Sequence, residues 1–369
     1  MLSRPPRIRS LKLPEHGRLI AISDIHGSME YFRGLLDKIG FSSADTLIID
    51  GDFLEKGPAC IETLHYIMSL CDGGNTHALL GNCDEWYLIF DIGQSGDVHH
   101  SEYLRRKRSG LLWEMLLSIG VDPATCESPS DYYPLLAEKY ASEWSFLRNL
   151  PHAIETDRFI FVHSGLDPRK PLAAHSVSEI TSRPAFLNEK SYFDKWIIVG
   201  HWPCVLYGES ITCANPIIDR EHHVISIDGG CVLKDDGQLN ALILDDIKTD
   251  AFRFEYYDRF PRAVALDSQG ASDISYYIRW GDSTVQVLDR GEEFSRCRHV
   301  RTGYEMDILT KYLFSPEPIT DCNDSTDYVL PVKPGDVISV NEVTSRGILG
   351  KLNGVSGWYF GRVEYISEK

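Results

Sequence analysis

Apolar runs that each lead into an Asp, Asn or His constrain the fold of this chain more than any other feature. The runs are RLIAIS (18–23), TLIID (46–50), HALL (77–80), FIFVH (159–163) and WIIV (196–199). Helical patterns at 29–39 and 59–70 lie between the first three. Short apolar runs predict buried strands, and strands that alternate with helices predict an α/β sheet.

The polar residues that follow these runs are of the types that bind metals. They are Asp24, His26, Asp52, Asn82, His163 and His201. An Asp or Asn beside Gly is a common turn residue, so any single one of these motifs has a structural explanation. The ordered set favours a metal centre instead, because the carboxyl ends of strands in an α/β sheet border one crevice.

Carboxylates and imidazoles together suit Mn²⁺, Fe or Zn²⁺. Two such ions about 3.5–4 Å apart can share a carboxylate and a hydroxide and clamp a phosphoryl group during in-line attack. We therefore expect two divalent metal ions, with Mn²⁺ as the first choice and Fe or Zn²⁺ as alternatives.

The order DIHG, GDFLEKGP, GNCD, VHSGL and GHWP resembles the calcineurin-like metallophosphoesterases, over about residues 17–247. Within them it is most similar to the phosphoprotein phosphatase branch and its bacterial relatives, including the symmetrical diadenosine tetraphosphate hydrolases. Pro203 stands where phosphodiesterase branches have a second histidine. The resemblance implies a two-sheet α/β sandwich flanked by helices.

The resemblance also implies a distribution of the ligands over two metals. Asp24 and His26 would hold the first metal, and Asp52 would bridge. The remaining three, Asn82, His163 and His201, would hold the second.

The chain departs from the family motif at a position that matters for catalysis. Cys83 replaces the histidine thought to protonate the leaving oxygen. A thiol with a pKa near 8.5 can donate a proton, although it hydrogen-bonds more weakly than imidazolium. It is also oxidisable, and it can ligate a soft metal. The alternative is that Cys83 is a small buried residue without a chemical role.

Neighbouring positions differ from the family as well. Glu55 stands where the family has the acid that orients the missing histidine, so it either keeps a related role or is a surface charge. Lys56 replaces an arginine, and an ammonium cannot make the bidentate phosphate contact of a guanidinium. Leu80 replaces another arginine. Arg183 matches an arginine that meets substrate phosphate in relatives, with Arg169 as a weaker candidate.

Charge and cysteine usage narrow the class of protein further. The formal net charge is −17, which argues against nucleic acid or an anionic membrane as partner. No run of 18 apolar residues is present, and the basic N-terminus lacks the apolar stretch of a signal peptide. The nine cysteines form no CxxC pair, which favours reduced thiols and a cytoplasmic protein.

We expect two domains. Residues 1–250 form the catalytic domain, with a helical insertion or cap at 94–150, and residues 251–369 form a β-rich domain. Only 304–313 has a helical pattern in the second domain. Residues 325–369 look like an SH3-like barrel, although Ile348 and Leu349 replace the tryptophans that would bind polyproline. The aromatic residues Trp358, Tyr359 and Phe360 are either core or a contact patch.

The function predicted is a dinuclear-metal-dependent phosphoester hydrolase, in which a metal-bridging hydroxide attacks phosphorus. The first choice is a phosphomonoesterase of the serine/threonine protein phosphatase type, acting on a phosphorylated protein or a small phosphoester. The alternatives are a phosphodiesterase or dinucleoside polyphosphate hydrolase. An alternative of another class is a weakly active metal-binding scaffold that binds a protein partner through its C-terminal domain.

Overall fold

The computed structural model describes residues 4–85, 102, 104–126 and 132–366, and the chain forms two compact units. The first unit consists of Met1–Pro203, Pro216–Leu233 and Gln238–Tyr257. The second consists of Cys204–Asn215, Lys234–Gly237 and Asp258–Lys369. Two short segments before residue 250 therefore belong to the second unit, and the division is not a single cut in the sequence.

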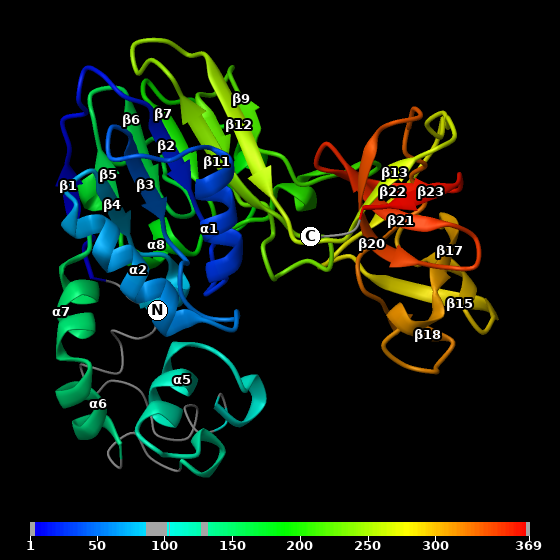
Figure 1. The fold of residues 1–369 in the computed structure, drawn as a ribbon, viewed down its shortest axis with the longest axis horizontal. Helices are drawn as coiled ribbons and strands as arrows, with labels where there is room; N and C mark the ends of the chain where they lie inside the picture. The colour runs from blue at the N-terminus through cyan, green and yellow to red at the C-terminus, as the bar shows by residue number, and fades with distance from the viewer. Residues whose placement is uncertain (1–3, 86–101, 103, 127–131, 367–369) are drawn as a thin grey trace. The chain divides into compact units, whose positions relative to one another are not determined.

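The first unit contains a five-stranded sheet in the order β12-β11-β2-β3-β4. Its strands are β2 (Leu19–Ile22), β3 (Thr46–Asp50), β4 (Thr76–Leu79), β11 (Leu239–Leu244) and β12 (Phe252–Tyr257). Strands β2, β3 and β4 are parallel, so their carboxyl ends lie at one edge. Helices α1 (Met29–Lys38) and α2 (Cys60–Asp72) connect these three strands and pack against the sheet (Figure 1).

A six-stranded sheet in the order β1-β5-β6-β7-β10-β9 forms the second layer of this unit. Its strands are β1 (Ile8–Ser10), β5 (Ala153–Glu155), β6 (Phe159–Val162), β7 (Trp196–Val199), β9 (Ile217–Asp219) and β10 (Val224–Ser226). Strands β6, β7 and β10 are parallel, as β2 to β4 are. Between β6 and β7 lie η3 (Leu172–Ala174), α8 (Val177–Thr181) and η4 (Phe186–Glu189).

The two sheets pack face to face because side chains alternate along each strand. On β2, Leu19 and Ala21 join a cluster with Phe161 and Ile198 of the other sheet, while Ile20 and Ile22 face the helices. A strand buried on both faces reads as a continuous apolar run, which explains the runs found in the sequence. The first unit is therefore a two-sheet α/β sandwich flanked by helices.

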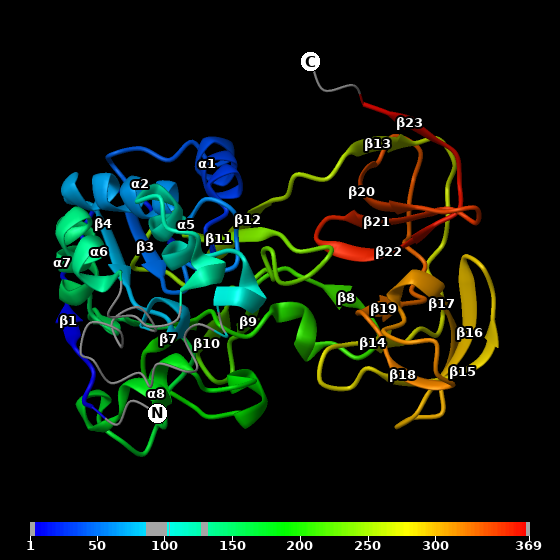
Figure 2. The same ribbon diagram turned by 90° about the horizontal axis from the view of Figure 1, so that it is seen from below.

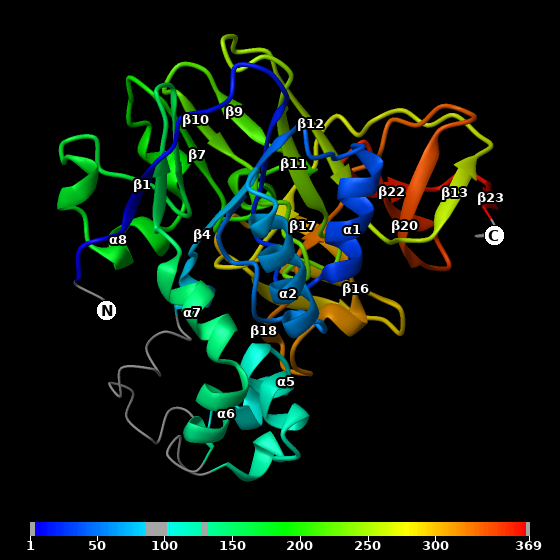
Figure 3. The same cartoon turned by 60° about the vertical axis from the view of Figure 1, so that its left-hand side comes forward.

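Helices also dominate the described part of 94–150, where an insertion was predicted. They are α5 (Leu111–Ser118), η1 (Pro123–Thr125), α6 (Tyr133–Lys139) and α7 (Ala141–Asn149). Helix α5 and helix α7 both lie beside α2 (Figure 3). Residues 94–101, 103 and 127–131 of the predicted insertion lie outside the described residues.

The second unit is β-rich, and among its described residues the only helical segments are the short η5 (Cys204–Tyr207) and η6 (Thr310–Tyr312). One sheet has the order β23-β13-β20-β21-β22-β8, another the order β17-β16-β15-β18, and β14 pairs with β19 (Figure 2). Their bounds are β8 Thr212–Cys213, β13 Arg262–Ala265, β14 Tyr277–Ile278, β15 Thr284–Arg290, β16 Phe294–His299, β17 Glu305–Leu309, β18 Ile319–Asp321, β19 Ser325–Thr326, β20 Val337–Val343, β21 Ile348–Leu352, β22 Val355–Tyr359 and β23 Val363–Tyr365.

Two expectations about the second unit can be compared with this arrangement. The helix predicted at 304–313 is wrong over Glu305–Leu309, because β17 pairs with β16 there and its alternate residues Met306 and Ile308 are buried; within the predicted range, Thr310–Tyr312 forms the short helix η6. Of the three consecutive aromatic residues, Trp358 and Tyr359 are buried and Phe360 is 53% exposed. The SH3-like assignment of 325–369 stays a prediction.

Among the described residues, no helix combines the length and the apolar character that a membrane span requires.

We predict that Phe161→Ala destabilises the first unit by about 3–5 kcal/mol, because it leaves a cavity between the two sheets. Phe161 is fully buried on β6. Urea denaturation followed by tryptophan fluorescence measures the change. The control Leu117→Ala, at a side chain that is 54% exposed, should change stability by less than about 0.5 kcal/mol. Equal effects of the two variants would contradict the packing described.

Candidate metal centre

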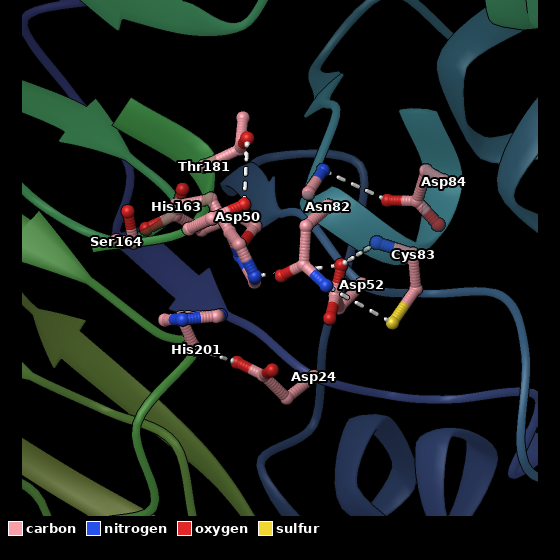
Figure 4. A network of polar contacts seen from close by, with 12 residues as sticks. Asp24, Asp50, Asp52, Asn82, Cys83, Asp84, His163, Ser164, Thr181 and His201 are labelled. Atoms are coloured by element: carbon pink, nitrogen blue, oxygen red, sulfur yellow. Dashed lines mark hydrogen bonds and ion pairs between the residues drawn. The ribbon is translucent and has the colours of Figure 1, made fainter. Parts of the chain in front are cut away.

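The predicted ligands lie at the carboxyl ends of strands from both sheets. Asp24 and His26 follow β2, Asp52 follows β3 and Asn82 follows β4. His163 and His201 follow β6 and β7 in the other sheet. Figure 4 labels five of the six, all except His26, and shows that their side chains converge from separate elements of the sandwich. The two-sheet fold thus brings together residues that are up to 177 positions apart, as in the hydrogen bond from His201 N–H to Asp24 Oδ2 (2.9 Å).

The backbone at this edge is strained. Four of the six predicted ligands have a positive φ, namely Asp24 (54°), His26 (50°), Asp52 (49°) and His201 (66°). A non-glycine residue in the left-handed region costs roughly 1–2 kcal/mol. Such residues cluster at functional sites, where the surrounding structure fixes them.

Close packing of the ligand loops explains two of the glycines in the motifs. A Cβ on Gly81 would lie 2.1 Å from Asp52 Oδ1, and a Cβ on Gly200 would lie 2.2 Å from Asp24 Oδ2. Any side chain at either position would push a ligand out of place. The glycine before Asn82 and the glycine before His201 therefore allow carboxylates of neighbouring strands to reach the centre.

The donor atoms have the spacing of ligands that share a cation. His163 Nε2 lies 3.4 Å from Asp52 Oδ1, and His26 Nε2 lies 3.7 Å from Asp24 Oδ1. Bonds of about 2.1 Å at right angles would place neighbouring ligand atoms roughly 3.0 Å apart. Donor atoms of Asp52, His163 and His201 all lie within 4.8 Å of one another. The same holds for His26, Asp52 and Cys83, so Asp52 belongs to both groups.

His163 is oriented toward the centre by its other ring nitrogen. Its Nδ1 lies 2.9 Å from the carbonyl oxygen of Asp50, to which it donates, and this leaves Nε2 facing Asp52. That Nε2 is buried and makes no hydrogen bond in the part of the chain that the structure describes. Burial opposes a charge on His163, but the carboxylates of Asp52 and Asp24 raise its pKa well above the usual value. The two carboxylates therefore stabilise a positive charge at this position.

His26 is held in a similar way. Its Nδ1 lies 3.3 Å from the carbonyl oxygen of Leu54. Burial, followed by the nearby charge of Lys56, lowers the pKa of His26 to about 3. The ring is therefore neutral at physiological pH, as a metal ligand must be.

The side-chain amide of Asn82 has two orientations, which differ in their hydrogen bonds and in whether the amide oxygen can bind a metal. In one, Oδ1 faces two acceptors, His201 Nδ1 at 2.8 Å and the carbonyl oxygen of Thr181 at 3.1 Å. In the other, the amide nitrogen donates to both atoms and the oxygen accepts from Cys83 N–H at 3.2 Å. Only the first orientation presents an amide oxygen and an imidazole nitrogen side by side to a metal. Burial lowers the pKa of His201 to about 4, which keeps its ring available as a ligand.

Cys83 lies inside the centre rather than beside it. Its backbone N–H donates to Asp52 Oδ1 at 2.8 Å, and the residue is 9% exposed. Burial, and then the charge of Asp52, raises the pKa of the Cys83 thiol well above its ordinary value. The thiol therefore keeps its proton at neutral pH.

Lys56 and Glu55 lie on the loop after Asp52. Lys56 Nζ is 3.4 Å from His26 Nε2. Burial opposes its charge, but Cys83, Asp52 and other acidic groups raise the pKa of Lys56, so the ammonium is retained. Glu55 is 3% exposed, so the alternative of a surface charge is wrong. Its carboxylate packs against Gly110, where a Cβ would lie 2.4 Å from Oε1.

Arg183 is half-buried and already has a partner. Its guanidinium forms two hydrogen bonds to Glu189, at 2.6 and 2.9 Å, while its backbone N–H donates to Ser164 Oγ beside His163. Arg169 pairs with Asp167 instead, and its side chain is 85% exposed. Of the two arginines, Arg183 is the one anchored at the ligand loops.

Two buried carboxylates near the ligands were not among the predicted site residues. Asp84 accepts from the backbone N–H groups of Leu54 and Gly81, at 3.1 and 3.0 Å, and joins two ligand loops. Asp228 is fully buried after β10, and its Oδ2 makes no hydrogen bond among the described residues. Burial, and then the charge of Asp228, raises the pKa of Asp24 well above its usual value. Asp228 follows an apolar run, as the ligands do, so the same signal could have found it.

Comparison with known proteins identifies the family. The calcineurin-like phosphoesterase model matches residues 17–230. The chain belongs to this family. Metallophosphoesterases of this family generally bind two divalent metals, in agreement with the two groups of donor atoms around Asp52.

The curated relatives of the chain include symmetrical bis(5'-nucleosyl)-tetraphosphatases. The protein from Aromatoleum aromaticum is 35% identical over 152 residues, which are 41% of this chain and 45% of the relative. The protein from Vibrio cholerae is 29% identical over 182 residues, 47% of this chain and 56% of the relative. The chain thus spans about half the length of the curated relatives it matches. A Saccharomyces cerevisiae protein serine/threonine phosphatase with similarity to human PP5 is 12% identical, with a TM-score of 0.41, over 69% of this chain and 84% of that one.

We predict that Glu189→Gln lowers the KM for a phosphoester roughly twofold to fivefold, because it frees the guanidinium of Arg183 from a partly exposed ion pair. Steady-state kinetics with p-nitrophenyl phosphate measures the change. Asp167→Asn is the matched control, since it releases Arg169 from a pair of the same geometry and should leave KM unchanged. A rise in KM for Glu189→Gln would show that Glu189 supports the site.

Proposed function

We propose that this protein is a dinuclear-metal-dependent phosphomonoesterase of the serine/threonine protein phosphatase type. The observation that carries the proposal is the position of Asp52, whose carboxylate belongs to two groups of donor atoms, one with His26 and Cys83 and the other with His163 and His201. One carboxylate between two ligand groups supports two ions at bridging distance. Family membership supports hydrolysis of a phosphoester as the reaction.

We propose that the residues that would hold the ions divide as the family resemblance implies. Asp24 and His26 serve the first ion, Asn82, His163 and His201 serve the second, and Asp52 serves both. Ions bound there would supply a hydroxide at neutral pH and neutralise phosphoryl charge. We propose Mn²⁺ as the native metal, with Fe or Zn²⁺ as alternatives, because the set combines carboxylate and amide oxygens with imidazoles.

The chain's own residues then bind and protonate the substrate. Lys56 contributes a retained positive charge 3.4 Å from His26, and Arg183 offers two N–H groups to a phosphate once Glu189 is displaced. Cys83 holds a proton that it can give to the leaving oxygen, because its pKa is raised. Glu55 is buried, so we propose that it holds the loop between Asp52 and Lys56 in position.

The raised pKa of Cys83 also affects which ester is preferred. A weak acid protonates a poor leaving group slowly, so an ester with a good leaving group gains relative to an alkyl phosphate. We therefore expect phosphoserine or phosphothreonine turnover to depend on Cys83 more than turnover of an aryl phosphate does.

Dinucleoside polyphosphate hydrolysis is the second candidate. The observation that favours it is the name of the curated relatives, symmetrical bis(5'-nucleosyl)-tetraphosphatase, which are 35% and 29% identical to matched parts of the chain. The leaving group in that reaction is itself a phosphate, which needs less help from a proton donor than a serine oxygen does. The replacement of the family histidine by Cys83 is compatible with it.

A weakly active scaffold remains the alternative of another class. In that case the β-rich second unit, including the SH3-like segment predicted at 325–369, would bind a protein partner. Trp358 is buried, with its indole N–H donating to the carbonyl oxygen of Thr326 at 2.7 Å, so it does not present a free aromatic donor to a ligand. We propose a cytoplasmic protein, because all nine cysteines are free.

Hydrolysis assays with added Mn²⁺ test the proposal. The substrates are p-nitrophenyl phosphate, a phosphothreonine peptide, bis-p-nitrophenyl phosphate and diadenosine tetraphosphate. We expect turnover of the monoesters, lost at least about 100-fold in Asp52→Asn, and a further rise for the phosphothreonine peptide in Cys83→His, since an imidazolium is the better proton donor.

The other outcomes discriminate the alternatives. Faster turnover of diadenosine tetraphosphate than of any monoester would replace the first candidate by the second. No turnover of any substrate, with metal bound to the protein, would favour the scaffold. Turnover that persists in Asp52→Asn would mean that the reaction does not use this centre.

A further inference from the structure

The segment of residues 4–10, called the N-terminal strap here, lies before the part of the chain that matches the family model, which begins at residue 17. Its strand β1 pairs in parallel with β5, at one edge of the six-stranded sheet. Strand β5 follows the segment that runs past the Asn82 loop, since the N–H of Leu80 donates to the carbonyl oxygen of Pro151 at 2.9 Å. One segment, which contains Pro151 and β5, therefore connects the strap with the loop of the proposed ligand Asn82.

Arg4 joins two elements that carry parts of the site. Its guanidinium donates to both carboxylate oxygens of Glu85, at 2.8 and 2.6 Å. Its carbonyl oxygen accepts from the N–H of Val177 at 3.0 Å, and Val177 is the first residue of α8. One residue of the strap thus links the turn that carries Asn82 to the helix that precedes Arg183.

Glu85 is a buried charge with partners on both sides. Its side chain is only 3% exposed, and it lies three residues after Asn82 in the helical turn of residues 82–85. His152 Nε2 lies 2.6 Å from the same carboxylate that Arg4 holds. Burial would raise the pKa of Glu85, but the hydrogen bonds from His152 and Arg4 lower it, so the carboxylate stays ionised.

The strap also fixes the state of His152. The backbone N–H of Arg7 donates to His152 Nδ1 at 2.9 Å, so Nε2 carries the proton that is donated to Glu85. The N–H of His152 donates in return to the carbonyl oxygen of Arg7 at 2.8 Å. His152 is fully buried, and burial lowers its pKa, which keeps the ring neutral in this tautomer.

These contacts hold the elements that lie beside the side-chain amide of Asn82. The Asn82 amide lies 2.8 Å from His201 Nδ1 and 3.1 Å from the carbonyl oxygen of Thr181, the last residue of α8. Arg4 holds both the turn that carries Asn82 and the start of α8. A shift of either element would move the amide away from His201.

We propose that the network of Arg4, Glu85 and His152 is a positioning device for the second metal. It fixes Asn82 against His201 and α8, and so sets the affinity of the ion that Asn82, His163 and His201 would hold. By fixing α8 it also sets the position of Arg183. Arg4, Glu85 and His152 act through Asn82 and do not touch the substrate. This inference rests on the proposed dinuclear centre.

Metal titration of the full-length protein tests the proposal. Isothermal titration calorimetry with Mn²⁺ resolves the two binding events in the wild type. In Arg4→Ala and in Glu85→Gln we expect the affinity for one ion to fall about 10- to 100-fold while the affinity for the other is retained. Arg4→Lys keeps the charge and one hydrogen bond, so it should recover part of the loss.

The matched control is Arg9→Ala, in the same strap. Among the described residues the side chain of Arg9 makes no hydrogen bond or ion pair, so both affinities should stay at their wild-type values. A purely structural role of the network predicts that both ions weaken together or that neither does, and either result would overturn the proposal. Arg4 is partly exposed, at 38% of its side chain, so Arg4→Ala keeps the test valid if Glu85→Gln fails to fold.

The readout separates this inference from the proposed function. A wild type that binds two ions without hydrolysing any phosphoester would refute the phosphoesterase and leave the role of the strap in place. Loss of hydrolysis in Arg4→Ala with both metal affinities unchanged would refute the role of the strap and leave the phosphoesterase in place.

Discussion

The rest of the structure depends on a group of carboxylates and imidazoles buried together at one edge of two sheets. Asp52 and His163 are each nearly inaccessible to water, and a buried carboxylate is stable only with a hydrogen bond or a positive charge beside it. The fold supplies part of this through backbone N–H groups, such as that of Cys83 on Asp52. His163 supplies more, because the carboxylates raise its pKa. Two divalent ions would supply the rest of the positive charge that the buried carboxylates need. The cluster would then be both stable and reactive.

The surrounding chain is arranged to hold that cluster against its own repulsion. Residues with left-handed backbone conformations and close-packed glycines bring the ligand loops to the centre. Their cost in backbone energy is offset by the packing of the surrounding sandwich. Asp84 joins two ligand loops through their N–H groups, and the N-terminal strap supports the Asn82 turn from outside. The ligands are therefore positioned by neighbours that come from distant parts of the sequence.

The sequence predicted the fold of the first unit and six candidate ligands that the fold brings together, because both follow from local patterns. An apolar run that ends in Asp or His marks a buried strand and its carboxyl end at once. Asp228 follows a run of the same kind, HVISI at 223–227, but was not among the predicted site residues. The burial of Glu55 could not be read from sequence, because it depends on packing against Gly110, which is 55 positions away.

Contacts between distant residues account for the rest of what the sequence did not reveal. The pairing of Arg183 with Glu189 and the link from Arg4 to Glu85 depend on tertiary structure, and surface and buried arginines look alike in a sequence. The pattern at 304–313 suited a helix, but pairing with β16 makes Glu305–Leu309 a strand. Local propensity is overridden where a neighbouring strand supplies hydrogen bonds and a buried face.

The central claim is that Asp52 lies between two metal ions. The most direct measurement is electron paramagnetic resonance of the protein after dialysis against Mn²⁺, together with a count of bound manganese. The account predicts two ions per chain and the spectrum of an exchange-coupled pair, which Asp52→Asn abolishes. A single uncoupled ion, or a coupled pair that survives in Asp52→Asn, would contradict it.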